Sequence, residues 1–182
     1  MAVTTRDALV HDDPIAWPLA EALSDCLCTL LEEEAPVRCC CVMFGADVAW
    51  DDCSCDGRRG GMAWVRIANV YPTATFPSPY TGQPGPCGGA YDGWAVTLEL
   101  GILRCAPTID ERGRLPRCDQ NWSAARRAAA DAHLMRRAVM CCSWAGDRRY
   151  IVGSWEPLGP EGGCHGGVMT VTVNSRACVC DG

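Results

Sequence analysis

The segment from residue 119 to 144 has the pattern of a long helix, and it lies between segments that have the pattern of strands. Its apolar side chains recur every three or four residues and would share one helical face: Trp122, Ala125, Ala129, Ala132, Met135, Val139 and Cys142. Asp119 or Asn121 is expected to cap the start of this helix, and Gly146 is expected to end it. A long helix between strands directs the chain towards a fold of mixed elements.

A first helix is predicted over residues 14–34. Asp13 can cap its start, and Pro14 suits the first helical position because no backbone N–H is required there. Leucines recur at spacings of three and four along one face: Leu19, Leu23, Leu27, Leu30 and Leu31. Pro36 ends the helix.

Six segments have the composition or the alternation of strands: residues 37–44, 48–50, 62–71, 94–104, 149–155 and 168–173. In the fourth of these, alternate side chains from Val96 to Ile102 are apolar and would share one face. The order of helix, strands, helix and two strands predicts an α+β fold, in which both main helices pack on one face of a mostly antiparallel sheet.

Two segments rich in proline and glycine, 72–93 and 106–117, are predicted to be loops. Loops as long as the first one are uncommon inside compact domains and are usually functional or mobile. A glycine-rich turn over 156–167 is expected to join the last two strands. The chain of 182 residues is predicted to be a single domain, with an insertion at about 72–93 and short flexible termini.

The composition argues against two classes of protein. The net charge of −6 is unlike that of a nucleic-acid binder, which usually presents a basic face. The N-terminal sequence MAVTTRDALVHDDP has no apolar core of a signal peptide, and no apolar run approaches the length of a membrane span. We therefore expect the protein to be made and folded in a cytoplasm, where cysteines are normally kept as thiols.

Fifteen cysteines are the most unusual feature of the composition, and five of them fall between Arg38 and Gly57. Structural zinc sites are usually built from C-x2-C pairs, and none occurs here, so Cys39, Cys41, Cys53 and Cys55 are weak candidates for metal ligands. Cys40 should face the opposite side of its strand from Cys39 and Cys41.

Two interpretations of the cysteines remain open, namely buried thiols and disulfide bonds. If residues 37–55 formed a hairpin, Cys39 or Cys41 could lie opposite Cys53 or Cys55, close enough for a disulfide after slight adjustment. The odd number of cysteines leaves at least one thiol free or paired outside the chain.

The sequence contains no recognisable catalytic constellation. It lacks a G-x-S-x-G motif, a P-loop and a dinucleotide-binding G-x-G-x-x-G after a strand. The three histidines, His11, His133 and His165, stand in unrelated segments, which is unlike a Cys–His nucleophilic site. We therefore predict that the protein is not an enzyme and needs no cofactor.

Three segments, AWVRIANVYPTATFP, WAVTLELGILRCAPT and YIVGSWEPLGPEGGCHGGVMTVTV, carry a resemblance to a known family. Together with the element order over residues 14–175, they resemble the tail terminators of tailed phages of actinobacteria, which act at the head–tail junction. The resemblance implies an α+β protomer that forms a ring, expected to be a homohexamer, which caps the tail tube and joins it to the neck.

The same resemblance implies the location and the partners. The protein would be assembled in the host cytoplasm and reside in the tail or neck of the virion. It would contact the tail tube protein and a neck stopper or adaptor, while DNA passes through the ring without sequence-specific binding. Candidate contact residues lie in or near the loops and the closing hairpin: Tyr71, Phe76, Tyr80, Arg112, Arg114 and Trp155. The alternatives are another neck protein, a stopper or adaptor, or a cysteine-rich zinc-binding or redox-responsive cytoplasmic protein.

Overall fold

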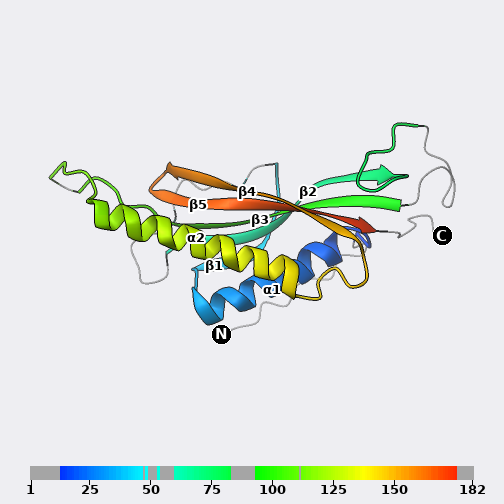
Figure 1. Ribbon diagram of the computed structural model, residues 1–182, viewed down its shortest axis with the longest axis horizontal. Helices are drawn as coiled ribbons and strands as arrows, with labels where there is room; N and C mark the ends of the chain where they lie inside the picture. The colour runs from blue at the N-terminus through cyan, green and yellow to red at the C-terminus, as the bar shows by residue number, and fades with distance from the viewer. Residues whose placement is uncertain are drawn as a thin grey trace.

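Two helices lie on one face of a five-stranded sheet in the computed structural model of the chain (Figure 1). The structure describes residues 13–46, 48, 53, 60–82, 93–110 and 112–175. The elements in chain order are α1 (Trp17–Glu34), β1 (Cys39–Met43), β2 (Met62–Thr73), β3 (Gly93–Cys105), α2 (Cys118–Cys141), β4 (Tyr150–Glu161) and β5 (Cys164–Ser175).

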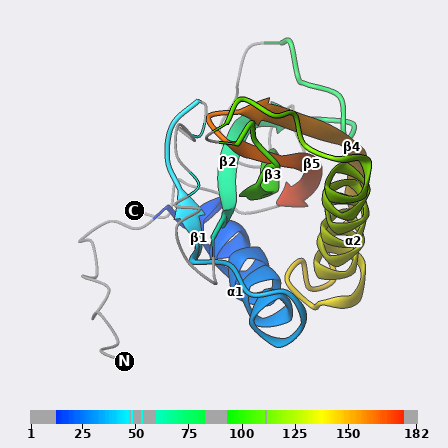
Figure 2. The same cartoon turned by 90° about the vertical axis from the view of Figure 1, so that its left-hand side faces the viewer.

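The strands lie in the order β1-β2-β3-β5-β4. Strands β2 and β3, β3 and β5, and β5 and β4 pair antiparallel, whereas β1 pairs parallel with β2. Viewed along the sheet, α1 and α2 lie side by side beneath it (Figure 2). The predicted α+β fold, with both helices on one face of a mostly antiparallel sheet, is confirmed.

The main core lies between the sheet and the two helices. The predicted alternation in β3 is confirmed, because Val96, Leu98, Leu100 and Ile102 are all buried against the helices. Helix α1 contributes the predicted leucines at 19, 23, 27 and 31, and α2 contributes four buried side chains from its second half: Leu134, Met135, Ala138 and Val139. Burial of a large aliphatic side chain contributes about 1.5–3 kcal/mol, so this layer supplies most of the driving force for folding.

A smaller apolar cluster lies on the opposite face of the sheet. Trp64 of β2 is 1% exposed and packs with Val48, Cys53 and Leu103. Its ring lies flat over Gly101, its register partner on β3, so closely that a β-carbon at Gly101 would come within 2.2 Å of the ring. Only glycine leaves room there for the indole.

The structure corrects several predicted boundaries of the helices. Helix α1 begins at Trp17, although Asp13 does cap the preceding turn by accepting hydrogen bonds from the backbone N–H groups of residues 15, 16 and 17. Helix α2 is capped neither by Asp119 nor by Asn121, because it begins at Cys118, two to four residues earlier than predicted, with Gln120 Oε1 accepting the N–H of Arg117. It ends at Cys141, and Gly146 lies in the turn that follows.

The prediction of a long turn over 156–167 is wrong. Strands β4 and β5 continue through these residues and are joined only by Gly162 and Gly163, both in the left-handed region that favours glycine. The predicted loop over 72–93 is also shorter than expected, since β2 runs to Thr73 and β3 begins at Gly93. The predicted strand residues 49 and 50, and both predicted flexible termini, lie outside the described residues.

Candidate interaction surface

The first candidate site, around the cysteines of β1, has a different pairing from the one predicted. Cys28 bonds to Cys40, Cys26 to Cys142 and Cys53 to Cys164, and Cys105 is also disulfide-bonded. Cys39 and Cys41 are free thiols. The predicted disulfide from Cys39 or Cys41 to Cys53 is therefore wrong. Cys55, the other predicted partner, lies outside the described residues.

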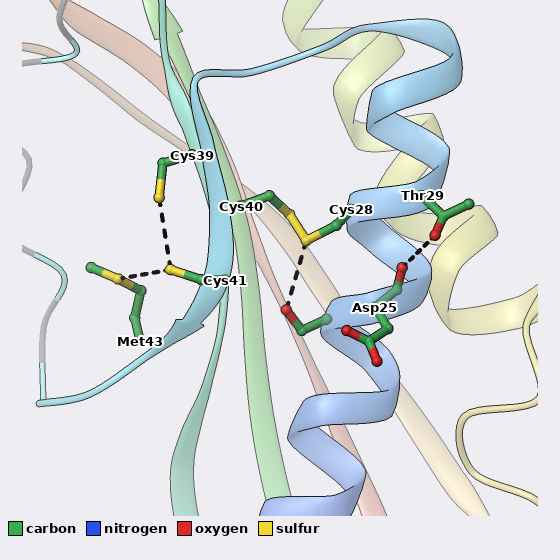
Figure 3. The surroundings of a disulfide bond; sticks show 8 residues. Asp25, Cys28, Thr29, Cys39, Cys40, Cys41 and Met43 are labelled. Atoms are coloured by element: carbon green, nitrogen blue, oxygen red, sulfur yellow. Dashed lines mark hydrogen bonds between the residues drawn. A yellow bond between two sulfur atoms is a disulfide. The ribbon is translucent and has the colours of Figure 1, made fainter. Parts of the chain in front are cut away.

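The physical reason is the direction of pairing. Strand β1 lies parallel to β2, so Cys39 and Cys41 have Met62 and Trp64 as neighbours instead of residues 53–55. Cys40 points to the other side of the strand, as the alternation predicted, and reaches Cys28 on α1 (Figure 3). The sequence separated the two faces of β1 correctly but could not show that α1 lies against one of them.

The thiols of Cys39 and Cys41 lie together on the side of β1 that faces away from α1 (Figure 3), with 3.8 Å between their sulfur atoms. Burial, and then the neighbouring Cys39, raises the pKa of Cys41 to about 11. Within the part of the chain that the structure describes, no group of three or more histidine, cysteine or acidic side chains is arranged to hold a metal ion.

The predicted contact residues of the first loop mainly hold that segment to itself. Tyr71 donates a hydrogen bond from its hydroxyl to the carbonyl of Pro77 at 2.8 Å, and Tyr80 donates its N–H to the carbonyl of Pro72 at 2.7 Å. The ring of Phe76 lies 5.9 Å from the guanidinium of Arg149. All three aromatic side chains are half-buried, so residues 72–80 form a compact turn.

Trp155 has a structural environment too. It packs partly against the main core, and its ring lies over Gly167 of β5, where a β-carbon would come within 2.4 Å of it. Its Nε1 is buried and has no hydrogen-bond partner among the described residues. The structure therefore places Trp155 at the margin of the core.

Arg112 and Arg114 are exposed in the loop that precedes α2. Asp110 organises this loop, since it accepts hydrogen bonds from the backbone N–H groups of both arginines and pairs with the Arg114 guanidinium at 2.7 Å. The hydrogen bond from the Arg114 backbone N–H, and next the one from its side chain, lower the pKa of Asp110. This loop is thus a charged projection whose conformation is fixed by Asp110.

The loop and the first half of α2 together form what we call the overhang, residues 106–110 and 112–130. It extends past the ends of β3 and β5 at the left of Figure 1. Three large apolar side chains on it are exposed, namely Ile109 at 60%, Leu115 at 76% and Trp122 at 64%. The guanidinium of Arg126 lies 5.5 Å from the Trp122 ring.

The overhang was misinterpreted from the sequence. Trp122, Ala125 and Ala129 follow the helical spacing of a core face, yet all three are exposed, because the sheet ends before this half of the helix does. Only the part of this face from Ala132 onward is buried. The arginines give no signal of this difference, because each half of α2 contains an adjacent pair, at 126–127 and at 136–137.

A pocket of about 570 Å³ lies where the overhang meets the body of the protein, and its lining includes Glu34, Trp122 and Arg126. At its base, the Arg104 Nε lies 3.0 Å from Asp131 Oδ2, and Nη2 lies 2.8 Å from Oδ1. Arg104 also donates hydrogen bonds to the carbonyls of Ala35 and Pro36. This buried pair is fully engaged in holding β3, α2 and the end of α1 together.

His165 lies beside this pair, in an adjoining pocket of about 330 Å³ that also contains Arg104 and Arg127. Burial is the main reason that the pKa of His165 is lowered; Arg127 and Arg104 act in the same direction, whereas Asp131 opposes them. The lowered pKa favours the neutral form of this imidazole, which lies near the paired Asp131.

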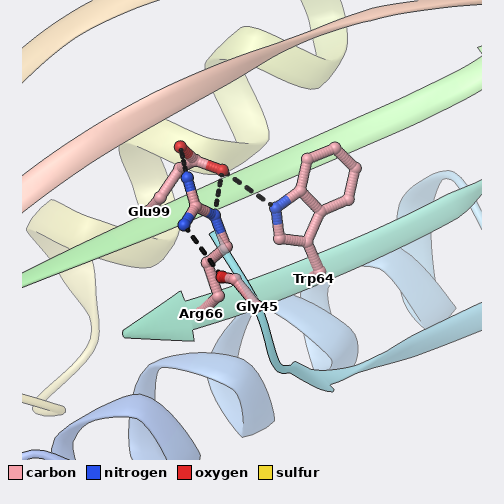
Figure 4. A network of polar contacts seen from close by, with 4 residues as sticks. All are labelled: Gly45, Trp64, Arg66 and Glu99. Atoms are coloured by element: carbon pink, nitrogen blue, oxygen red, sulfur yellow. Dashed lines mark hydrogen bonds and ion pairs between the residues drawn. The ribbon is translucent and has the colours of Figure 1, made fainter. Parts of the chain in front are cut away.

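The face of the sheet away from the helices carries a polar network. Arg66 of β2 pairs with Glu99 of β3 through two hydrogen bonds of 2.8 and 2.7 Å, and it donates a third to the carbonyl of Gly45 (Figure 4). The indole N–H of Trp64 also points to Glu99, at 3.3 Å. This network joins β2, β3 and the segment after β1.

Strand β4 forms one edge of the sheet and presents the second exposed apolar surface. Ile151 is 46% exposed and Val152 is 36% exposed. The register of β4 is irregular between Val152 and Trp155 and between Leu158 and Glu161, and its later part contains Pro157 and Pro160; these features discourage further strand pairing. Only residues 150–152 pair with β5 in regular register ahead of the first irregularity, and they contain neither proline nor charge.

No family model matches the sequence, and no curated protein matches it significantly. Neither helix in the described part of the chain is long and apolar enough to cross a membrane.

Proposed function

We propose that the protein is a structural component of a tailed-phage virion, namely a tail terminator that forms a ring on the tail tube. The observation that carries the proposal is the overhang, where Ile109, Leu115 and Trp122 are exposed on a rigid helix and its capping loop. Large exposed aromatic and aliphatic side chains of this kind mark protein–protein contacts. The resemblance of the strand segments supplies the kind of assembly.

A closed ring requires two different surfaces on each protomer, because each copy contacts its neighbours head to tail. The overhang follows Cys105, which pairs with Cys164 at the start of β5, whereas Ile151 pairs with Thr172 near its end. Cys164 and Thr172 are eight residues apart along the strand, or about 27 Å. The overhang and the start of β4 thus lie at opposite ends of the protomer.

The proposed interface seats the overhang of one protomer against the start of β4 in the next. Trp122 would cover Ile151, on the face of β4 away from the helices, and the arginines around Trp122 would form the polar rim of the contact. The ring is expected to contain six copies, to contact the tube protein on one side and a neck protein on the other, and to act without catalysis. DNA would pass through its centre.

The test uses tail tubes assembled from the tube protein encoded in the same genome. Tubes imaged by electron microscopy after mixing with the purified chain should carry added density at one end and should stop lengthening. A Trp122→Glu variant should leave the ends bare. Tubes that remain bare and continue to grow with the wild-type chain, or density along the whole tube, would contradict a terminator.

A further inference from the structure

We propose that Cys39, Cys41 and Met43 form a binding site for a soft monovalent metal ion, with Cu(I) as the expected occupant. The three sulfur-bearing side chains occupy every second position of β1, so they share one face of the strand. Figure 3 shows them on the side of β1 that is turned away from α1. They lie apart from the overhang, and the proposal does not depend on ring formation.

Two of the three distances between the sulfur atoms fit ligands of a shared ion. Cys39 Sγ lies 3.8 Å from Cys41 Sγ, which in turn lies 3.7 Å from Met43 Sδ. Two sulfurs bonded to one first-row metal ion at about 2.3 Å lie about 3.8–4.0 Å apart when the bond angle is between tetrahedral and trigonal. An ion could therefore bridge each pair with little movement of the side chains.

The ligand types select the ion. Thiolate and thioether sulfurs together favour Cu(I), whereas structural zinc takes four ligands that are usually thiolate or imidazole. Three sulfurs from a single strand supply a three-coordinate site with one neutral member. Cys53, a metal candidate from the sequence, is bonded to Cys164 and is not available as a ligand.

The surroundings permit entry of the ion. Cys39 is exposed and Cys41 and Met43 are half-buried, so solvent reaches the site. The nearest charged register partner on β2 is Arg66, opposite Met43, and it is held by Glu99 and the carbonyl of Gly45. Binding balances as one Cu(I) taken up and two thiol protons released to solvent, which leaves a site with a single negative charge.

The experiment titrates the full chain with Cu(I) under anaerobic conditions, with ascorbate present and bicinchoninate as the competing chromophoric chelator. The test variant is Cys39→Ser with Cys41→Ser. The matched control is Cys118→Ser with Cys141→Ser, which removes the other two free thiols among the described residues, both exposed on α2. Circular dichroism of every variant shows whether the fold is retained.

The wild-type chain and the control should each bind one additional Cu(I) ion tightly, which the test variant does not bind. Met43→Leu nearly conserves volume and should lower the affinity for this Cu(I) ion about 10-fold or more. Loss of even an outer-shell partner of a metal site has an effect of that size. X-ray absorption should report three sulfur neighbours. Equal uptake by wild type and test variant, loss of the equivalent in the control, an unchanged affinity in Met43→Leu, or Zn(II) displacing Cu(I) would overturn the proposal.

Discussion

Arg104 of β3 and Asp131 of α2 form a buried, two-pronged ion pair, with Nε to Oδ2 and Nη2 to Oδ1 distances of 3.0 and 2.8 Å. Their side chains are only 6% and 2% exposed. Arg104 reaches the carbonyls of Ala35 and Pro36 as well. The pair therefore lies where the end of β3, the middle of α2 and the end of α1 meet, next to the overhang.

Replacing one partner of this pair should destabilise the protein strongly. Asp131→Ala leaves a buried guanidinium without its carboxylate, and such losses cost about 3–5 kcal/mol of unfolding free energy. Chemical denaturation measures the change. Asp119→Ala, which removes the exposed pair with Arg117, is the matched control and should leave the transition nearly unmoved. A small effect of Asp131→Ala would show that water enters this pocket freely.

Gly101→Ala should lower the melting temperature because the new methyl group would collide with the Trp64 ring. Overpacking of this kind costs about 1–3 kcal/mol. If Gly101→Ala melts like the wild type, the indole does not lie flat on β3 in solution.

The stability of the protein should fall as the pH drops below about 6.5, in part through His165. Burial lowers its pKa in the folded state, so the unfolded chain takes up the proton more readily and acid favours unfolding. Above the unfolded pKa this residue makes no difference. His165→Gln should flatten the decline between pH 6.5 and 5 relative to wild type. Parallel curves for wild type and His165→Gln would contradict the half-buried placement of the imidazole.

Peptide mapping under non-reducing conditions should recover Cys28 linked to Cys40 and Cys53 linked to Cys164. Reduction should then lower the melting temperature. The short loop closed by Cys28 and Cys40 contributes about 3 kcal/mol in the chain-entropy account, and the long loop closed by Cys53 and Cys164 contributes about 4.7 kcal/mol. A peptide that joins Cys39 or Cys41 to Cys53 would restore the hairpin pairing that the structure rejects.

The sequence predicted well those elements whose local pattern and tertiary surroundings agree. The alternation in β3 and the leucines of α1 match the buried face because each element is covered along its whole length. The sequence also placed Cys40 correctly on the opposite side of β1 from Cys39 and Cys41, because alternation of side chains is a property of the strand alone.

The errors arose where surroundings beyond local reach decide the outcome. The helical spacing that includes Trp122 continues into a region where no sheet remains to cover it, and periodicity cannot report where a neighbouring sheet ends. The Cys53 pairing depended on the direction of β1 relative to β2, and the buried role of Arg104 depended on a partner 27 residues away. None of these relationships has a signal within a single segment.

Trp122 carries the central claim, because the proposed ring closes through it. Native mass spectrometry of the purified chain should give a closed assembly, expected to contain six copies. Trp122→Glu should give a folded monomer, since a charge would be placed at the centre of an apolar contact. Met140→Glu, at an equally exposed position in the second half of the same helix, should still assemble. A wild-type chain that stays monomeric at every concentration at which it is soluble, or a Trp122→Glu variant that still forms the closed assembly, would contradict the account.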